Sequence, residues 1–486
     1  MPLPTIPSGN VFSSLPTGYT VANSCRFSGS DDRLVRDATG TSTESNNKWT
    51  FSCWVKRGKL GAEQMLVDHR SSGSAQFNIR FMSDDSLQAY DVVGGSVLMQ
   101  KDTTAKYRDP SAWMHILWSS DRSISSPTTK LWVNGTEVTS WATDNEYSQD
   151  DTGTANSDAP TWIGEENSSG SNFEGYLAEM VWLDGTFVSG ATDFGEFDED
   201  SPTIWKPKDV SGLTFGTNGW YLDFKASANL GNDANGGTDF GETGIAAVDQ
   251  CKDSPTNSFC TMNPLNNYYP GGTLSEGNTN VVTGSSSYTF LTGTIGVSTG
   301  KWYYEAKIID EGTHANVGIA TKPPYTTNIY PGFEPNDYFY KSTDGNSYTS
   351  DAGSSYGNTY TTNDIIGVYI DLDNSKLYFA KNGTVQNSGT GISITTPAAA
   401  SIDFSSESGQ PGSGFYFPAV GDYSGSDTST FALNFGNGQF AGTAVSSGNA
   451  DANGYGNFEY DPSSGTFDSA SKNFLAICTK NLAEHG

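Results

Sequence analysis

The sequence predicts an all-β protein made of two tandem antiparallel β-sandwiches. Aromatic residues make up 13% of the 486 residues, so much of the core must be aromatic, and 55 glycines give frequent turns. Short apolar runs alternate with polar residues, which is the period-2 pattern of strands that face a core on one side. No long stretch shows the 3.6-residue period of an amphipathic helix.

The first sandwich is expected to follow an extended N-terminal arm at residues 1–24, which is rich in Pro, Ser and Thr. Its clearest strand is 48–56, where apolar side chains alternate with more polar ones and predict a half-buried strand. Further strands are expected over 113–118, 130–133, 161–164 and 176–183, with an Asn-Gly hairpin turn at 134–135.

The order and spacing of four motifs in this region resemble the laminin-G or pentraxin-like branch of the concanavalin A-like jelly rolls. The motifs are Phe51–Lys56, Trp113–His115, Leu131–Gly135 and Phe173–Glu179. The resemblance implies a jelly roll, which we place at 25–225. A connector is expected over 226–274, with a flexible Gly/Asn/Asp-rich loop at 231–244.

A second ordered set resembles the SPRY domain. It comprises the strand Trp302–Glu305, the strand Val317–Ala320, a hairpin from Gly367 to Gly383, the strand Phe417–Ala419 and a final Asn434–Gly436. The resemblance implies a SPRY-like sandwich, placed at 275–437 and expected to fold on its own. A C-terminal tail over 438–486 includes an apolar run at 474–478, which is either a last strand or a docking segment.

Charge and cysteine content argue against nucleic acid, anionic lipids and zinc as partners. The net charge of −29 predicts a surface that repels nucleic-acid phosphates and anionic lipids. Five cysteines without a CxxC pair favour buried thiols in a reduced compartment over a zinc site, with a Cys251–Cys260 disulfide as the open alternative. The N-terminus lacks a signal-peptide pattern, and no apolar run suits a membrane helix, so synthesis and folding in a cytoplasm are expected.

No catalytic residues are expected. The only run similar to the paired carboxylates of glucanases is 196–200, and its Glu196 and Asp198 lie in a turn-like acidic stretch. His115 lies inside a predicted strand and is expected to be packed or hydrogen-bonded there. No cofactor is expected and the metal ligands are unknown, although calcium stays open because carboxylate pairs occur at Asp31–Asp32, Asp84–Asp85 and Asp150–Asp151.

Aromatic residues beside Asn and Asp mark one loop as the best ligand-binding candidate, since such residues suit stacking and protein hot spots. The alternative is that these aromatics cap the sandwich core. The candidate residues are Tyr325, Tyr330, Phe333, Tyr338 and Tyr340.

The two folds, with the connecting run 253–259, together resemble laminin-G plus SPRY proteins of tailed phages, particularly marine ones. The resemblance implies a virion surface protein, such as a tail fibre or receptor-binding protein, that recognises a host-surface glycan or protein. Other virion proteins would be partners, the N-terminal arm would anchor the chain, and homotrimers are common among such fibres. The alternatives are a capsid decoration protein without a receptor role and a polysaccharide depolymerase.

Overall fold

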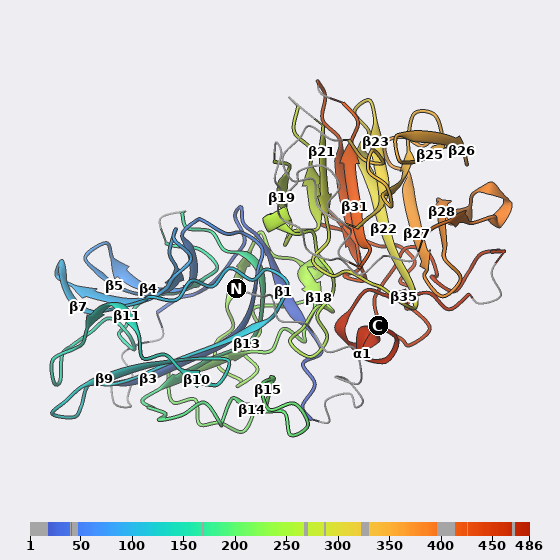
Figure 1. Ribbon diagram of the computed structural model, residues 1–486. Coiled ribbons are helices and arrows are strands. Elements are labelled where there is room, and N and C mark those ends of the chain that lie inside the picture. The colour runs from blue at the N-terminus through green and yellow to red at the C-terminus, as the bar shows by residue number, and fades with distance from the viewer. Residues whose placement is uncertain are drawn as a thin grey trace. The chain divides into compact units, whose positions relative to one another are not determined.

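The computed structural model describes residues 18–38, 40, 47–167, 170–266, 271–285, 288–321, 330–395, 414–424, 426–468 and 472–486. The chain divides into two compact units, and each is described here by itself. The N-terminal unit comprises 18–256 with 275–277, and the C-terminal unit comprises 257–274 with 278–486. Both are built of sheets that are antiparallel except where β35 joins β22 (Figure 1), which confirms the predicted all-β fold class.

Two eight-stranded sheets form the N-terminal unit. The first has the order β10 (Thr136–Glu137), β9 (Thr128–Val133), β8 (Met114–Asp121), β3 (Lys48–Arg57), β13 (Glu174–Asp184), β1 (Ser24–Ser28) and β18 (Gln250–Cys251), with β16 (Trp220–Leu222) also on β13. The second has the order β11 (Trp141–Asn145), β7 (Ser96–Thr103), β6 (Leu87–Val93), β5 (Ala75–Phe81), β4 (Gln64–Ser72), β12 (Thr161–Ile163), β2 (Arg33–Arg36) and β17 (Gly241–Thr243). A separate pair joins β14 (Gly195–Phe197) to β15 (Trp205–Pro207).

Strand β3 is buried on both faces, although its alternation predicted a half-buried strand. Trp49 and its apolar neighbours on one face pack in the core between the two sheets. Trp54, on the other face, packs in a second cluster with Phe194, Trp205 and Phe215 from the segment between β13 and β16. A strand stays half-buried only if nothing covers its outer side. Here a later segment of the chain covers the outer side of β3.

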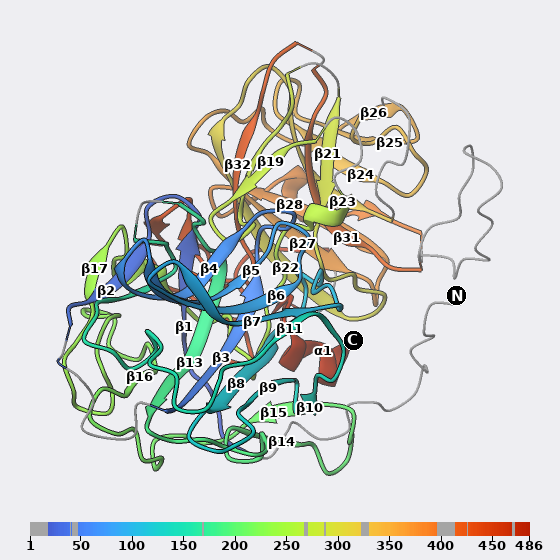
Figure 2. The same cartoon turned by 90° about the vertical axis from the view of Figure 1, so that its left-hand side faces the viewer.

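The predicted connector contributes strands to this unit. β17 pairs with β2, side by side in Figure 2, and β18 pairs with β1. Phe240 is buried in the main core, within the stretch expected to be a flexible loop. The short helix η1 (Ala247–Asp249) leads into β18.

The C-terminal unit has a nine-stranded and a six-stranded sheet. The first has the order β19 (Thr273–Ser275), β20 (Asn280–Val282), β32 (Thr430–Asn434), β22 (Lys301–Asp310), β27 (Ile365–Asp371), β28 (Lys376–Lys381) and β29 (Thr384–Val385), with β30 (Ile392–Ser393) on β28 and β35 (Leu475–Ala476) on β22. The second has the order β21 (Thr289–Thr292), β31 (Phe417–Asp422), β23 (Ala315–Ala320), β24 (Tyr338–Lys341), β25 (Asn346–Thr349) and β26 (Ala352–Ser355). The remaining elements are β33 (Gln439–Phe440), β34 (Thr443–Ala444), η2 (Pro264–Asn266), η3 (Asn387–Gly389) and α1 (Thr479–His485).

The C-terminal tail covers the outer face of the nine-stranded sheet. β35 pairs in parallel with β22, so the apolar run at 474–478 does form a strand. Phe458, Phe467 and Phe474 of the tail pack in one buried cluster with the strand residues Tyr303 and Tyr369. The tail therefore belongs to the core of this unit.

Candidate functional site

The candidate site lies on the outer face of the six-stranded sheet. Because side chains alternate along a strand, the neighbours of the core residues Val317, Tyr340 and Val420 point away from the core. We call the aromatic residues that gather on this outer face, from strand β25, from the ends of β21 and β31 and from the loop before β24, the tyrosine face. Its members are Tyr288, Tyr330, Phe333, Tyr348 and Tyr423.

Four of the five rings form a contiguous cluster, and the Lys341 ammonium lies between the fifth, Tyr348, and Tyr423, at 5.2 and 4.5 Å from their ring centroids. Tyr330 lies at its centre, with ring centroids 4.1 Å from Tyr423, 5.3 Å from Tyr288 and 5.2 Å from Phe333. All three contacts are edge-on, the arrangement that ring quadrupoles favour. Phe333 is 41% exposed, and the four tyrosines are half-buried, so the cluster is open to solvent.

The loop that carries Tyr330 and Phe333 is held against this face. Its Pro331 lies where a Cβ atom on Gly421 of β31 would come within 2.7 Å, so only glycine allows this close approach. The backbone N–H of Asp351, in the turn between β25 and β26, donates to the carbonyl of Gly332 at 3.0 Å. The rings are therefore presented by a backbone that is bonded to the sheet.

Acidic and basic side chains hold three tyrosines of the tyrosine face in place. The Lys341 ammonium lies 4.5 Å from the ring centroid of Tyr423 and 3.7 Å from the carboxylate of Asp344. The Tyr348 hydroxyl donates to Asp344 at 2.7 Å, and the Tyr330 hydroxyl donates to Asp351. Burial and these carboxylates raise the pKa of both hydroxyls, which therefore stay protonated donors at neutral pH.

The five predicted ligand-binding residues do not all lie on one surface. Tyr330 and Phe333 lie on the tyrosine face. Tyr338 and Tyr340 of β24 are buried in the sandwich core, where the Tyr340 hydroxyl donates to the carbonyl of Asn358. Tyr325 lies outside the described residues.

Sequence reasoning missed the other three members of the face. Tyr348 lies opposite Gly353 in the β25–β26 hairpin, and Tyr288 and Tyr423 follow the register of β21 with β31. The sequence signal was weak, because a tyrosine in a strand reads the same whether it points inward or outward. Only the pairing register shows which side it takes.

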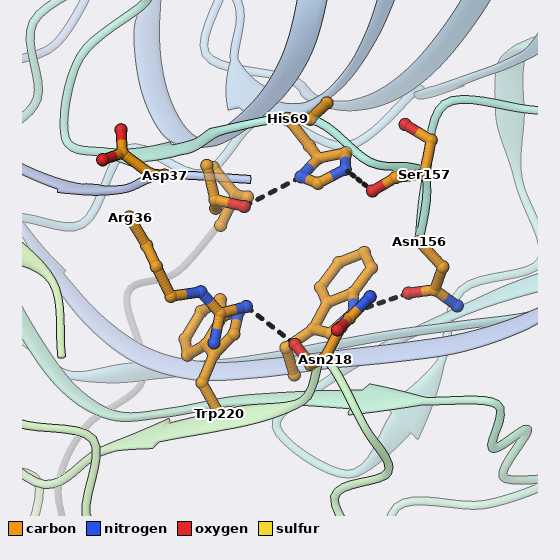
Figure 3. A pocket seen from close by; sticks show the side chains of 11 residues that line it. Arg36, Asp37, His69, Asn156, Ser157, Asn218 and Trp220 are labelled. Atoms are coloured by element: carbon orange, nitrogen blue, oxygen red, sulfur yellow. Dashed lines mark hydrogen bonds between the residues drawn. The ribbon is translucent and has the colours of Figure 1, made fainter. Parts of the chain in front are cut away.

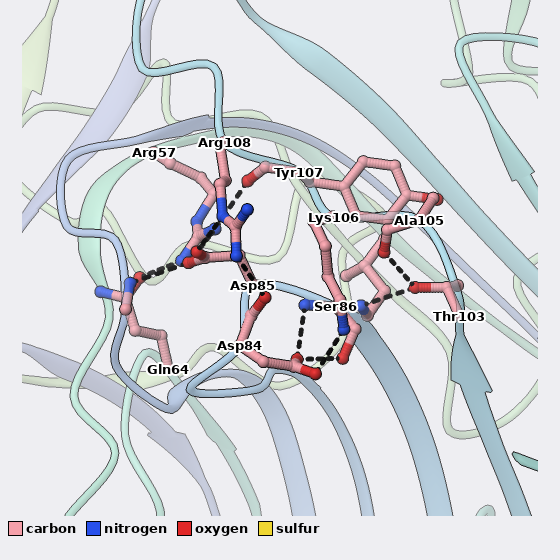
Figure 4. Close-up of polar contacts among 12 residues, drawn as sticks. Arg57, Gln64, Asp84, Asp85, Ser86, Thr103, Ala105, Lys106, Tyr107 and Arg108 are labelled. Carbon is pink, nitrogen blue, oxygen red and sulfur yellow. Dashed lines mark hydrogen bonds and ion pairs between the residues drawn. The ribbon is translucent and has the colours of Figure 1, made fainter. Parts of the chain in front are cut away.

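Cations neutralise Asp84 and Asp85, one of the three carboxylate pairs considered for calcium (Figure 4). Asp85 pairs with Arg57 at 3.0 Å and with Arg108 at 2.8 Å, and Asp84 pairs with Lys106. Lys106 lowers the pKa of the Asp84 carboxyl below its usual value. Burial would raise the pKa of Asp85, but the N–H of Gly61 and the two guanidinium groups hold it below its usual value. A divalent cation would have to displace all three side chains, so these residues do not fit calcium.

The other two carboxylate pairs, Asp31–Asp32 and Asp150–Asp151, are hydrogen-bonded to neighbouring polar groups. Asp32 accepts the N–H of Ser28 at 2.6 Å, and Asp150 accepts from Asn47 at 2.8 Å. Among the described residues, no three His, Cys, Asp or Glu side chains gather in a way that could hold a metal ion.

A small cavity in the N-terminal unit is lined by Arg36, His69, Trp182 and Trp220 (Figure 3). Its volume of about 20 Å³ suits roughly one water molecule. Both ring nitrogens of His69 are used, one at 2.8 Å from the Thr161 hydroxyl and one at 3.1 Å from the carbonyl of Ser157. Burial lowers the pKa of His69 to about 4, so it is a neutral structural residue at neutral pH.

The acidic run at 196–200 is not a paired-carboxylate cleft. Glu196 is exposed on the two-stranded β14–β15 ribbon, and Asp198 accepts the N–H of Ser201 at 2.9 Å in the following turn. His115 is buried, with Nε2 2.8 Å from the Ser52 hydroxyl and Nδ1 accepting from Trp205 at 3.1 Å, which confirms the prediction that it is packed and bonded.

The five cysteines are all buried and free, as expected, and Cys251 and Cys260 form no disulfide. No helix among the described residues has the length and apolar character needed to span a membrane.

Comparisons with known proteins identify two regions of the chain. Residues 28–189 match the concanavalin A-like lectin/glucanases superfamily, and residues 301–427 match the SPRY domain. The SPRY domain of human HERC1 is a similar solved structure, with 17% identity, 32% of this chain and 87% of that chain covered, and a TM-score of 0.25. A putative carbohydrate binding protein from Bacteroides ovatus has 15% identity, coverage of 47% and 60%, and a TM-score of 0.32.

Curated relatives match over a short segment. A Ran-binding proteins 9/10 homolog of Drosophila melanogaster is 38% identical over 88 residues, which are 18% of this chain and 9% of the relative. Human Ran-binding protein 9 is 36% identical over 86 residues, which are 17% of this chain and 12% of the relative. The chain thus spans only about a tenth of the length of these relatives.

The expectation of a phage virion surface protein is wrong, because these relatives are Ran-binding proteins of animals. The same finding overturns its variants, the tail fibre, the capsid decoration protein and the depolymerase. It also overturns the virion surface as the location, and virion proteins and host-surface glycans as the partners. The chain combines a concanavalin A-like jelly roll with a SPRY domain, and the two curated relatives named above are animal proteins.

Proposed function

We propose that this chain is a non-catalytic protein-interaction protein whose C-terminal unit binds a segment of another polypeptide at the tyrosine face. The carrying observation is the group of four half-buried tyrosines and the exposed Phe333, held on the sheet by hydrogen bonds from Tyr330 and Tyr348 to carboxylates. The names of the matched Ran-binding proteins support a role in binding proteins.

The physical argument concerns contact area and entropy. Tyrosine and phenylalanine supply large apolar area with few rotatable bonds, and they are enriched among the residues that dominate binding energies. Rings that are already packed on each other lose little rotamer freedom when a partner binds. Hydroxyls whose donors are committed to Asp344 and Asp351 still accept hydrogen bonds from a partner's backbone.

A displayed library of random twelve-residue peptides tests this proposal. Peptides selected on the purified full-length chain should lose roughly ten-fold or more in affinity when Phe333 or Tyr423 is replaced by serine, as measured by isothermal titration. Tyr90→Ser is the matched control, since Tyr90 is a half-buried tyrosine of the N-terminal unit. Thermal unfolding of each variant checks that it is folded.

Two results would refute the proposal. One is that no peptide is enriched. The other is that the enriched peptides bind the Phe333→Ser and Tyr423→Ser variants as tightly as the unchanged chain.

A further inference from the structure

We propose that the partner segment binds as an added β-strand along β26, and that it carries lysine or arginine at alternate positions. This inference rests on the proposed function and deepens it by naming the binding mode and the chemistry of the partner.

Strand β26 is an open sheet edge. It is last in the order of the six-stranded sheet, all four of its residues are exposed, and within the part of the chain that the structure describes it pairs only with β25. It lies at the margin of its unit in both overall views (Figures 1 and 2). Its sequence, Ala-Gly-Ser-Ser, contains neither a charge nor a proline, the usual features that protect an edge from pairing.

The hairpin turn determines which backbone groups face this edge. Ser350 and Asp351 have φ values of 51° and 58°, which make a two-residue turn of type I′. Such a turn makes Thr349 and Ala352 the first hydrogen-bonded pair, so the pairs alternate from there. The N–H and C=O groups of Gly353 and Ser355 therefore point away from β25, toward a strand that could add there.

The edge is held in place before any partner binds. The N–H groups of Ser350 and Asp351 donate to the carbonyls of Glu334 and Gly332 at 3.3 and 3.0 Å. Beyond β26, the N–H of Gly357 donates to the carbonyl of Gly345 at 2.8 Å. A preformed edge costs little entropy to use, which favours strand addition.

The charges around β26 select a cationic partner. The turn carries Asp351, and Asp344 lies 2.7 Å from the hydroxyl of Tyr348, which pairs across from Gly353. Residues 257–486 contain no arginine, and their acidic residues outnumber their lysines. Lys341 offsets one of the two carboxylates, Asp344, at 3.7 Å, so the acidic excess of the unit leaves the edge negative and charge complementarity favours lysine or arginine over glutamate.

The ring of Tyr348 provides the contact for every second side chain. A Cβ atom on Gly353 would lie 2.9 Å from this ring, so the glycine leaves the ring close to the open edge. Side chains of an added strand alternate between faces, and those on the outer face lie beside the ring, whose hydroxyl donates to Asp344. A lysine or arginine there shares the Tyr348 ring and the Asp344 carboxylate with Lys341, whose ammonium lies 5.2 Å from the ring centroid and 3.7 Å from the carboxylate.

Two fluorescent ten-residue peptides test the inference by anisotropy with the full-length chain. One alternates lysine with threonine, and the other alternates glutamate with threonine. We expect binding of the lysine peptide that weakens with added salt, and roughly ten-fold weaker or no binding of the glutamate peptide. Asp344→Asn should reduce this preference.

Ser355→Pro tests the backbone contact, because proline removes an N–H that faces solvent and is tolerated on an edge strand. Ser355→Ala is the matched control, since it keeps that N–H. We expect roughly ten-fold weaker binding of the lysine peptide for the proline variant and unchanged binding for the alanine variant. Thermal unfolding confirms that both variants are folded.

The inference is overturned if neither peptide binds, if both bind equally, or if Ser355→Pro binds like the unchanged chain. If Ser355→Pro has no effect while Tyr423→Ser abolishes binding of library peptides, the tyrosine face binds proteins and the strand addition is excluded. The two proposals are supported together by two results. Tyr423→Ser loses binding of both the lysine peptide and the library peptides, and Ser355→Pro loses binding of the lysine peptide.

Discussion

Deletion of the C-terminal tail, residues 438–486, should abolish cooperative folding of the C-terminal unit. The tail supplies large buried apolar side chains: Phe458, Phe467, Phe474, Leu475 and Ile477. Burial of each such side chain contributes roughly 1.5–3 kcal/mol, so their loss removes about 8–15 kcal/mol. Native domains are stable by only about 5–15 kcal/mol in total.

The deletion also removes polar anchors. The fully buried carboxylate of Glu305 accepts the backbone N–H groups of Glu459 at 3.0 Å and Tyr460 at 2.8 Å, both from the tail. Without the tail this carboxylate loses two of its donors, and Tyr303 and Tyr369 lose their cover. The alternating strands of 275–437 alone predict an independent module, whereas the packing predicts that it is incomplete.

Urea unfolding of two fragments, 257–486 and 275–437, decides between these expectations. Trp302 is the only tryptophan in either fragment and is fully buried, so its fluorescence reports on this unit alone. We expect a single sigmoidal transition for 257–486 and a gradual change for 275–437. A sigmoidal transition of 275–437, with a slope in proportion to its length, would refute the reasoning.

Three other predictions concern buried polar groups. Glu305→Gln should destabilise the chain by about 1–3 kcal/mol in urea unfolding, because the amide NH₂ replaces an accepting oxygen and leaves a buried N–H unpaired; an unchanged midpoint would contradict this. Burial raises the pKa of Glu305 from 4.5 to about 7, so the folded chain keeps this proton at pH values where the unfolded chain has lost it. The contribution of Glu305 to stability is therefore full below pH 4.5 and decreases by about 3 kcal/mol as the pH rises through 7. A series of unfolding midpoints against pH should show this decrease in the unchanged chain and not in Glu305→Gln. Asp253→Ala should cost about 3–5 kcal/mol in thermal unfolding, because the buried ammonium of Lys56, 2.6 Å away, loses its counter-ion; Asp223→Ala is the control and should have a much smaller effect, because the ammonium of its partner Lys225 is exposed to solvent.

The parts of the fold that depend on local chemistry could be predicted. Asn134–Gly135 and Asn382–Gly383 both adopt positive φ angles and close two-residue hairpins, as the Asn-Gly signal indicates. β3 lies within two residues of its predicted bounds, because its alternating side chains face the core.

What could not be predicted depends on contacts between distant segments. The burial of Trp54 requires Trp205, about 150 residues later, and the burial of Tyr303 requires Phe458. Neither partner is marked in the local pattern, since an outward aromatic residue looks the same whether it is covered or exposed. The same ambiguity put Tyr340, a core residue, among the candidate ligand-binding residues and left out Tyr348.

This ambiguity also explains why the fold was predicted correctly and the function was not. The motifs that carry the resemblance to SPRY domains, such as Trp302–Glu305 and Val317–Ala320, are buried and determine how the sheets pack. Proteins with unrelated partners share such core positions, because a sandwich needs the same packing whatever it binds. The tyrosine face and the β26 edge are made of other residues, none of which belongs to the motifs that carry the resemblance. A change such as Phe333→Ser should therefore alter binding while leaving the sandwich folded, which is why the test of function lies in these outward residues.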